Sequence, residues 1–197
     1  MLHIKTLPLG AYQTNCYLAW GEGSDDCIVI DPGYNPEIVL KKAEELGKRV
    51  DAILLTHGHF DHVGGVHGIV EITGCPVYIH EMELSQPEEM TAGPLHYTCT
   101  YGEGDMLSLA GLSVRVLHTP GHTQGSVCLL VEDTIFSGDT LFMESCGRTD
   151  FPGGSWNQMM ASLDRLKNLS GDYRVLPGHG PATKLSAERQ FNPYMNR

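Results

Sequence analysis

The sequence predicts a single α/β domain over residues 1–197, and three observations support that prediction. Short apolar runs of strand length alternate with stretches in which apolar residues recur at helical spacing. Most of the short runs stop at turns that contain glycine, proline or aspartate. Apolar residues make up 41% of the chain and charged residues 19%, with no low-complexity segment, so one sizeable core is expected.

The first half of the chain is expected to contribute three short strands and a helix. Residues 27–30 form an apolar run that ends at an Asp-Pro-Gly turn, as a buried strand would. Asn35 is expected to cap a helix over residues 36–46, because a proline follows it and apolar residues then fall on one face. Residues 50–55 are predicted to form a second buried strand and residues 77–79 a third.

The second half begins with a polar, irregular segment at residues 81–101, in which only helical pieces are expected. Two hairpins are predicted, over residues 106–117 and 126–136, and a Gly-rich loop over residues 137–154 follows them. The remaining expected elements are a helix capped by Ser155, a strand over residues 173–176 and a short helix over residues 186–191.

Charge and cysteine content limit the partners and the location of the protein. The formal net charge is −11, whereas binding to nucleic acid requires a basic surface. No apolar stretch approaches the length of a membrane span, and no secretory signal opens the chain. The six cysteines are scattered without a C-x-x-C pair, which favours reduced thiols. We therefore expect a soluble, cytoplasmic protein that binds neither nucleic acid nor a membrane. A monomer or a homodimer is expected.

Three histidines and an aspartate lie close together directly after the second predicted strand: His57, His59, Asp61 and His62. Imidazole and carboxylate are ligands of zinc, iron and similar metals. His57 and His59 are two residues apart, so they point the same way in an extended segment. A surface cluster is a weaker interpretation, because ligand-type side chains at the exit of a core strand are costly to bury unpaired.

Three further candidates follow later strands, each on a tight turn that contains glycine. His122 lies in a T-P-G-H-T segment, Asp139 in S-G-D-T and His179 in P-G-H-G. Together with the first cluster they supply enough ligands for two ions. Asp31 ends a strand near the same region, and we expect it to hydrogen-bond a metal-bound imidazole.

The order H-x-H-x-D-H, P-G-H-T, S-G-D and P-G-H-G resembles the metallo-β-lactamase superfamily over residues 31–179. The resemblance implies an αββα sandwich, in which two mixed β-sheets pack face to face with helices outside. It also implies the ligand sets: His57, His59 and His122 for a first ion, Asp61, His62 and His179 for a second, with Asp139 bridging both.

The segment after Asp139 is similar to the glyoxalase II branch (hydroxyacylglutathione hydrolases), in which G-D-T-L-F precedes C-G-K-x-Y. Here Arg148 stands at the lysine position and Asp150 at the tyrosine position. The resemblance implies a thioesterase for S-acyl-glutathione or a similar small thioester. The chain departs from that family in length: with 18 residues after His179, we expect no C-terminal helical domain. We expect a metal-bound hydroxide as nucleophile, Asp61 orienting it and Arg148 contacting the substrate. Zinc is the favoured ion, and iron and manganese are also compatible.

Two other functions are compatible with the same residues. The stretch at residues 147–150 is similar to the G-R-T-D of persulfide dioxygenases, which would use a single iron on His57, His122 and Asp139. A non-catalytic, metal-stabilised binding domain is disfavoured, because a structural zinc site closes with four ligands. β-Lactam hydrolysis is not expected, because no feature of an antibiotic pocket is visible in the sequence.

Overall fold

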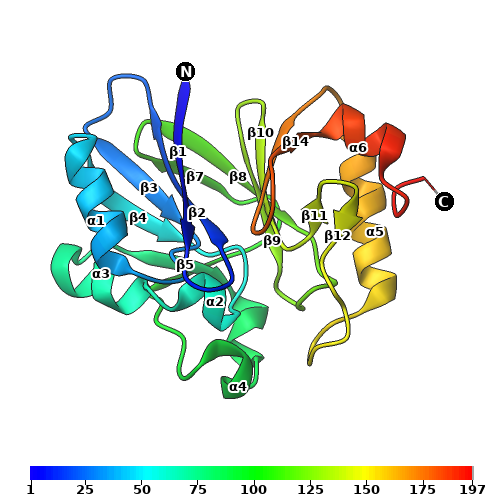
Figure 1. The fold of residues 1–197 in the computed structure, drawn as a ribbon, viewed down its shortest axis with the longest axis horizontal. Coiled ribbons are helices and arrows are strands. Elements are labelled where there is room, and N and C mark those ends of the chain that lie inside the picture. Colours follow the sequence, from blue (N-terminus) through cyan, green and yellow to red (C-terminus); the bar gives the residue numbers. More distant parts are fainter. Residues whose placement is uncertain (197) are drawn as a thin grey trace.

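Two mixed β-sheets form the centre of the structure, a computed structural model that describes residues 1–196 (Figure 1). In the first sheet, β1, β2 and β3 pair antiparallel, whereas β3 to β6 run parallel. Its six strands are, in order across the sheet, β1 (Leu2–Leu9), β2 (Thr14–Gly21), β3 (Asp26–Ile30), β4 (Arg49–Leu54), β5 (Val77–His80) and β6 (Cys99–Tyr101).

In the second sheet, β10 and β13 pair parallel and the other neighbours pair antiparallel. Across this sheet, the order of the six strands in residues 1–196 is β14 (Thr183–Lys184), β13 (Arg174–Pro177), β10 (Thr134–Gly138), β9 (Val127–Val131), β8 (Leu112–His118) and β7 (Met106–Leu109). A small ribbon follows β10 and consists of β11 (Leu141–Phe142) and β12 (Ser145–Cys146).

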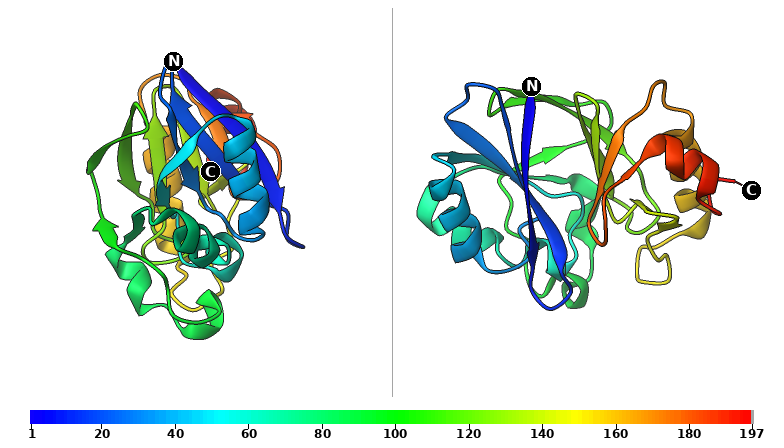
Figure 2. Two further views of the ribbon diagram at one scale, coloured as in Figure 1. Left: turned by 90° about the vertical axis from the view of Figure 1, so that its left-hand side faces the viewer. Right: turned by 45° about the horizontal axis from the view of Figure 1, so that its top comes forward.

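Helices cover the outer face of each sheet, so the layers are αββα, as predicted (Figure 2). Apolar residues of α1 (Pro36–Glu45) and α3 (Val66–Thr73) pack with the first sheet. Apolar residues of α5 (Trp156–Lys167) and α6 (Leu185–Phe191) pack with the second. A third apolar cluster lies between the two sheets.

The two-residue period of the strands divides side chains between these layers. In β4, Ala52 and Leu54 belong to the cluster between the sheets, whereas Ile53 belongs to the cluster under the helices. The second half of β4 is buried on both faces, and it therefore appears in the sequence as part of the continuous apolar run of residues 52–55. Across the interface, Phe136 of β10 meets the ring of Tyr17 edge-on, with centroids 5.2 Å apart.

The N-terminal hairpin of β1 and β2 was not expected from the sequence. Strand β1 contains Pro8, which lies opposite Asn15, and β1 is the edge strand of its sheet. An edge strand tolerates proline because one side of it makes no ladder hydrogen bonds. Asn35 is the N-cap residue of α1, which begins at Pro36 as predicted, but it has a left-handed conformation and makes no side-chain cap. Its side-chain amide donates to Glu37 instead of accepting from a backbone amide.

Two segments hold more regular structure than predicted. Residues 81–101 contain the 3₁₀ helix η1 (Glu81–Ser85) and α4 (Glu88–Thr91), as helical pieces, but they end in strand β6. The loop at 137–154 contains the β11–β12 ribbon. Among residues 1–196 the cysteines form no disulfide bond. Within the same residues, no helix combines the length and the apolar character that crossing a membrane requires.

Candidate metal centre

The seven predicted ligand side chains gather at one edge of the sandwich. His57 lies three positions after the end of β4, and His122 lies four positions after the end of β8. Asp139 and His179 follow β10 and β13, which are parallel neighbours and therefore end at the same edge. The chain thus brings to one place groups that lie up to 122 positions apart in the sequence (179 − 57).

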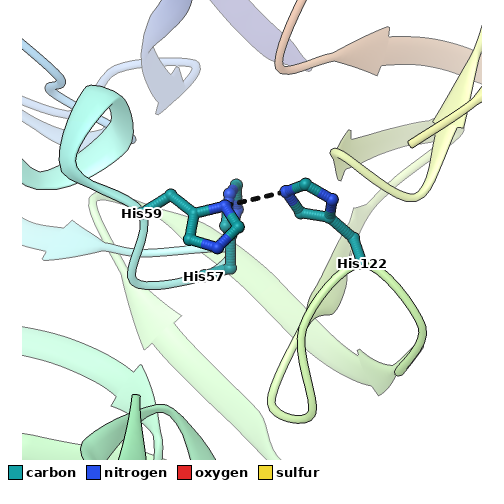
Figure 3. A group of neighbouring side chains, drawn as sticks. All are labelled: His57, His59 and His122. Carbon is teal, nitrogen blue, oxygen red and sulfur yellow. Dashed lines mark hydrogen bonds between the residues drawn. The ribbon is translucent and has the colours of Figure 1, made fainter. Parts of the chain in front are cut away.

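The first cluster contains His57, His59 and His122, whose ligand atoms all lie within 4.8 Å of one another (Figure 3). Nε2 of His122 lies 2.9 Å from Nδ1 of His59. Burial, followed by the neighbouring histidines, lowers the pKa of His57 well below its usual range and that of His59 to about 3. Both rings are therefore neutral, which is the form of imidazole that binds metal.

Hydrogen bonds on the far side of two rings fix their orientation. Nδ1 of His122 lies 2.8 Å from the carbonyl oxygen of Arg148, so it carries the hydrogen and donates it. The hydroxyl of Thr56 donates to Asp31 over 2.6 Å and therefore accepts from Nδ1 of His57 at 3.1 Å. Both rings direct Nε2 toward the cluster, as metal-binding histidines require.

The second cluster contains Asp61, His62 and His179. Nε2 of His179 lies 3.2 Å from Oδ2 of Asp61 and 3.3 Å from Nε2 of His62. Burial opposes ionisation of Asp61, but the hydrogen bond from His179 and the charge of His62 lower its pKa overall. Thr14 also donates to this carboxylate over 3.0 Å. Asp31 accepts from Nδ1 of His62 at 2.9 Å, as expected for the residue that orients an imidazole.

Asp139 lies between the two clusters. Its Oδ1 is 3.4 Å from Nε2 of His62, and its Oδ2 is 3.5 Å from Nε2 of His122 and 3.6 Å from Nε2 of His179. The neighbouring Gly178 leaves room for this carboxylate, because a Cβ there would lie 2.3 Å from Oδ1. One carboxylate therefore faces both clusters at once.

The donor set fits two divalent ions that share Asp139. Nε2 of His57 and Oδ1 of Asp139 are buried without a hydrogen-bond partner among residues 1–196, an arrangement that a cation would satisfy. A third group, of Asp31, His57 and His62, is close enough in space to hold an ion. It is not a good site, because Asp31 already accepts from the amide and hydroxyl of Thr56 and from His62.

A cavity of about 520 Å³ opens onto Asp61, Asp139, His59, His122 and His179. Its other walls are mostly apolar and carry one guanidinium group: Tyr12, Phe60, Met90, Phe142, Phe151 and Arg148. A substrate in this cavity would therefore meet both clusters at one end and aromatic rings along its sides.

Arg148 both lines the cavity and pairs with Asp150. Its Nε and Nη2 each lie 2.7 Å from an oxygen of Asp150, and its guanidinium carbon lies 3.8 Å from the ring centroid of Phe151. The ion pair is exposed, so it is a weak constraint that a stronger anion could replace.

Several residues at this centre were not expected from the sequence. Thr56 and Thr14 orient ligand side chains, and the only local signal was that Thr56 directly precedes His57. The aromatic wall is built from segments before β2, in α2 (Phe60–Val63) and after β10, and nothing in their sequences marks them as neighbours.

Comparisons with known proteins agree with this geometry. A family profile described as "Metallo-beta-lactamase superfamily" matches residues 9–179, a range that contains all seven side chains. Hydroxyacylglutathione hydrolase GloC of Haemophilus influenzae is 34% identical over 210 residues, which cover 99% of each protein.

Two solved structures are similar over nearly the whole chain. BLEG-1, described as a B3 metallo-beta-lactamase, has a TM-score of 0.90 at 33% identity, and the match covers 99% of this chain and 100% of BLEG-1. TTHA1623, in a di-iron-bound form, has a TM-score of 0.86 at 39% identity, and the match covers 96% and 99% of the two chains.

Proposed function

Because the chain belongs to the metallo-beta-lactamase superfamily, we propose that it is a metal-dependent hydrolase of small thioesters such as S-acyl-glutathiones. The observation that carries this proposal is the cavity that opens onto two ligand clusters joined by one carboxylate. The GloC relative supports the thioester as substrate, since it matches over nearly its whole length.

The proposed ligand sets are His57, His59 and His122 for a first ion, Asp61, His62 and His179 for a second, and Asp139 for both. Two divalent ions, zinc being favoured, would supply Lewis acidity for the carbonyl and lower the pKa of a shared water. Asp61 is the proposed catalytic residue beside its role as ligand. Its low pKa keeps it a carboxylate, so it can orient a water by accepting a hydrogen bond.

The side chains of the cavity walls are proposed to contact the substrate. The rings of Tyr12 and Phe60 pack edge-on at 5.5 Å, and Phe151 meets His59 edge-on at 5.9 Å, so the acyl or thiol portion would lie against aromatic surface. Arg148 is proposed to bind a carboxylate of the substrate in place of Asp150. With a cavity of this size we propose a small molecule, and neither nucleic acid nor a membrane, as the partner.

The test is turnover of S-D-lactoylglutathione by protein reconstituted separately with zinc, manganese and iron(II), while dissolved oxygen is recorded. We expect loss of thioester without oxygen uptake. Inactivity on this thioester and on S-acetyl-glutathione with every metal would reject the proposal. Because BLEG-1 is a relative, a chromogenic β-lactam belongs in the same assay, and preferential β-lactam hydrolysis would also reject it.

A second candidate is a persulfide dioxygenase that uses a single iron on His57, His122 and Asp139. The G-R-T-D sequence at residues 147–150 favours it, and TTHA1623 demonstrates that a relative accepts iron. Oxygen uptake by the iron form on addition of glutathione persulfide, with no thioester hydrolysis, would move the assignment to this activity.

Replacing Arg148 by alanine should separate charged from neutral substrates. We expect the KM for S-D-lactoylglutathione to rise about tenfold, and the KM for an uncharged thioester of N-acetylcysteamine to change less than about twofold. Bound metal should not change, because His122 contacts only the backbone oxygen of Arg148. The exposed Lys41 on α1 provides the control, as Lys41→Ala. Equal effects on both thioesters would mean that Arg148 pairs with Asp150 but does not bind the carboxylate of the substrate.

A further inference from the structure

A buried carboxylate lies directly behind the first ligand cluster. Glu83 is in η1, and its side chain is fully buried, at 0% exposure. Burying a carboxylate is costly unless several donors surround it. The burial raises the pKa of Glu83, and hydrogen bonds from Thr123, Gly58, Gly125 and Gln86 act against that increase. The proposed chemistry does not use this residue, so its burial calls for another explanation.

The two oxygens of Glu83 bind two different loops. Oε2 accepts from the amide of Gly58 over 2.6 Å, and Oε1 accepts from the amide of Gly125 over 2.8 Å. Both positions lack a side chain where the carboxylate approaches. A Cβ at Gly125 would lie 2.7 Å from Oε1, and a Cβ at Gly58 would lie 3.1 Å from Oε2.

Each of these loops carries part of the first cluster. Gly58 lies between His57 and His59, and Gly125 lies three positions after His122. The loop that carries His122 and Gly125 is closed at its base by a hydrogen bond, in which the amide of Thr119 donates to the carbonyl oxygen of Ser126 over 2.8 Å. Glu83 therefore joins the loop after β4 of the first sheet to the loop between β8 and β9 of the second.

We propose that Glu83 is a positioning residue for the first ion, which holds the His57–His59 loop and the His122 loop at the separation that the three imidazoles need. The inference rests on the metal binding that the proposed function requires and is independent of the substrate. Hydrogen bonds that orient ligands from outside the coordination sphere are typically worth 10–100-fold in metal affinity.

The first test is Glu83→Gln, which keeps the shape of the side chain but replaces one acceptor oxygen by an NH₂ donor. One of the two glycine amides then faces a donor and loses its bond. We measure zinc binding to purified metal-free protein by competition with a chromophoric chelator. One of the two zinc dissociation constants should rise at least tenfold, and the other should change less than threefold. Glu81→Gln, an exposed position on the same 3₁₀ helix, is the matched control.

The second test disturbs the contact between Glu83 and Gly125 by changing the glycine instead of the carboxylate. Gly125→Ala places a methyl group against Oε1 and should weaken the same zinc site by a similar factor. This variant also keeps the proposal testable where Glu83→Gln does not fold. Thermal melting of the metal-free variants provides a separate readout, because a merely structural role lowers the melting temperature without changing zinc affinity.

The proposal would be overturned if both variants fold and their zinc dissociation constants lie within twofold of those of Glu81→Gln. The outcome does not depend on turnover. A wild-type protein that binds two zinc ions but hydrolyses no thioester would refute the proposed function and leave the role of Glu83 standing.

Discussion

Replacing His57 by alanine is expected to lower kcat/KM for the thioester by more than about 100-fold and to reduce bound metal below two ions per chain. His57 contributes the buried Nε2 that has no hydrogen-bond partner among residues 1–196, and its loss leaves the first cluster with two imidazoles. Mutation of a residue that only orients a metal ligand by a hydrogen bond typically costs 10–100-fold in metal affinity or activity. Removal of a ligand should therefore exceed that range. Metal content by mass spectrometry and steady-state kinetics check both parts.

The control for this variant is His67→Ala, which changes an exposed histidine on α3 that lies outside the seven-residue set. It should retain two ions and full activity. Unchanged turnover and metal content in His57→Ala would exclude the two-ion mechanism proposed above.

Replacing Gly178 by alanine is expected to have an effect of similar size without removing any ligand. The new methyl group would lie 2.3 Å from Oδ1 of Asp139 and 2.7 Å from Cε1 of His62. Real Cβ atoms essentially never approach so closely, so the carboxylate that faces both clusters must move. We expect kcat/KM to fall more than about 100-fold and metal affinity to fall with it.

Gly102→Ala provides the matched control for Gly178→Ala, because a Cβ at Gly102 meets no atom within 4 Å. Neither glycine has a φ in the left-handed region, so backbone strain does not separate the two substitutions. Wild-type kinetics in Gly178→Ala would mean that Asp139 tolerates displacement and is not held in place by this contact.

The fold class and the grouping of the seven side chains were predictable because both depend on local patterns. Strands buried on both faces give continuous apolar runs such as residues 52–55, and His57, His122, Asp139 and His179 each lie within four positions of a strand end. The family resemblance then supplied the sandwich, which the structure and the comparisons confirm. The role of each residue as a ligand stays a prediction that the His57→Ala experiment addresses.

The parts that could not be predicted depend on partners outside the segment itself. Strand β1 contains Pro8 and is stable only because β2 pairs along one side of it. Strand β6 has three residues and exists through its parallel pairing with β5. The burial of Glu83 depends on two glycine amides that lie 67 positions apart in the sequence (125 − 58). None of these partners leaves a signal in the segment it stabilises.

The division of the site between the two sheets has a consequence for the lifetime of the protein. Four of the seven side chains follow β4, and three follow strands of the second sheet. An ion bound by side chains from both sheets would cross-link the two halves of the sandwich. Each tenfold increase of the free-ion concentration above the dissociation constant would add about 1.4 kcal/mol to the free energy of unfolding. A shortage of metal would therefore reduce the amount of protein as well as its catalysis, because the metal-free chain opens more often and is more easily degraded.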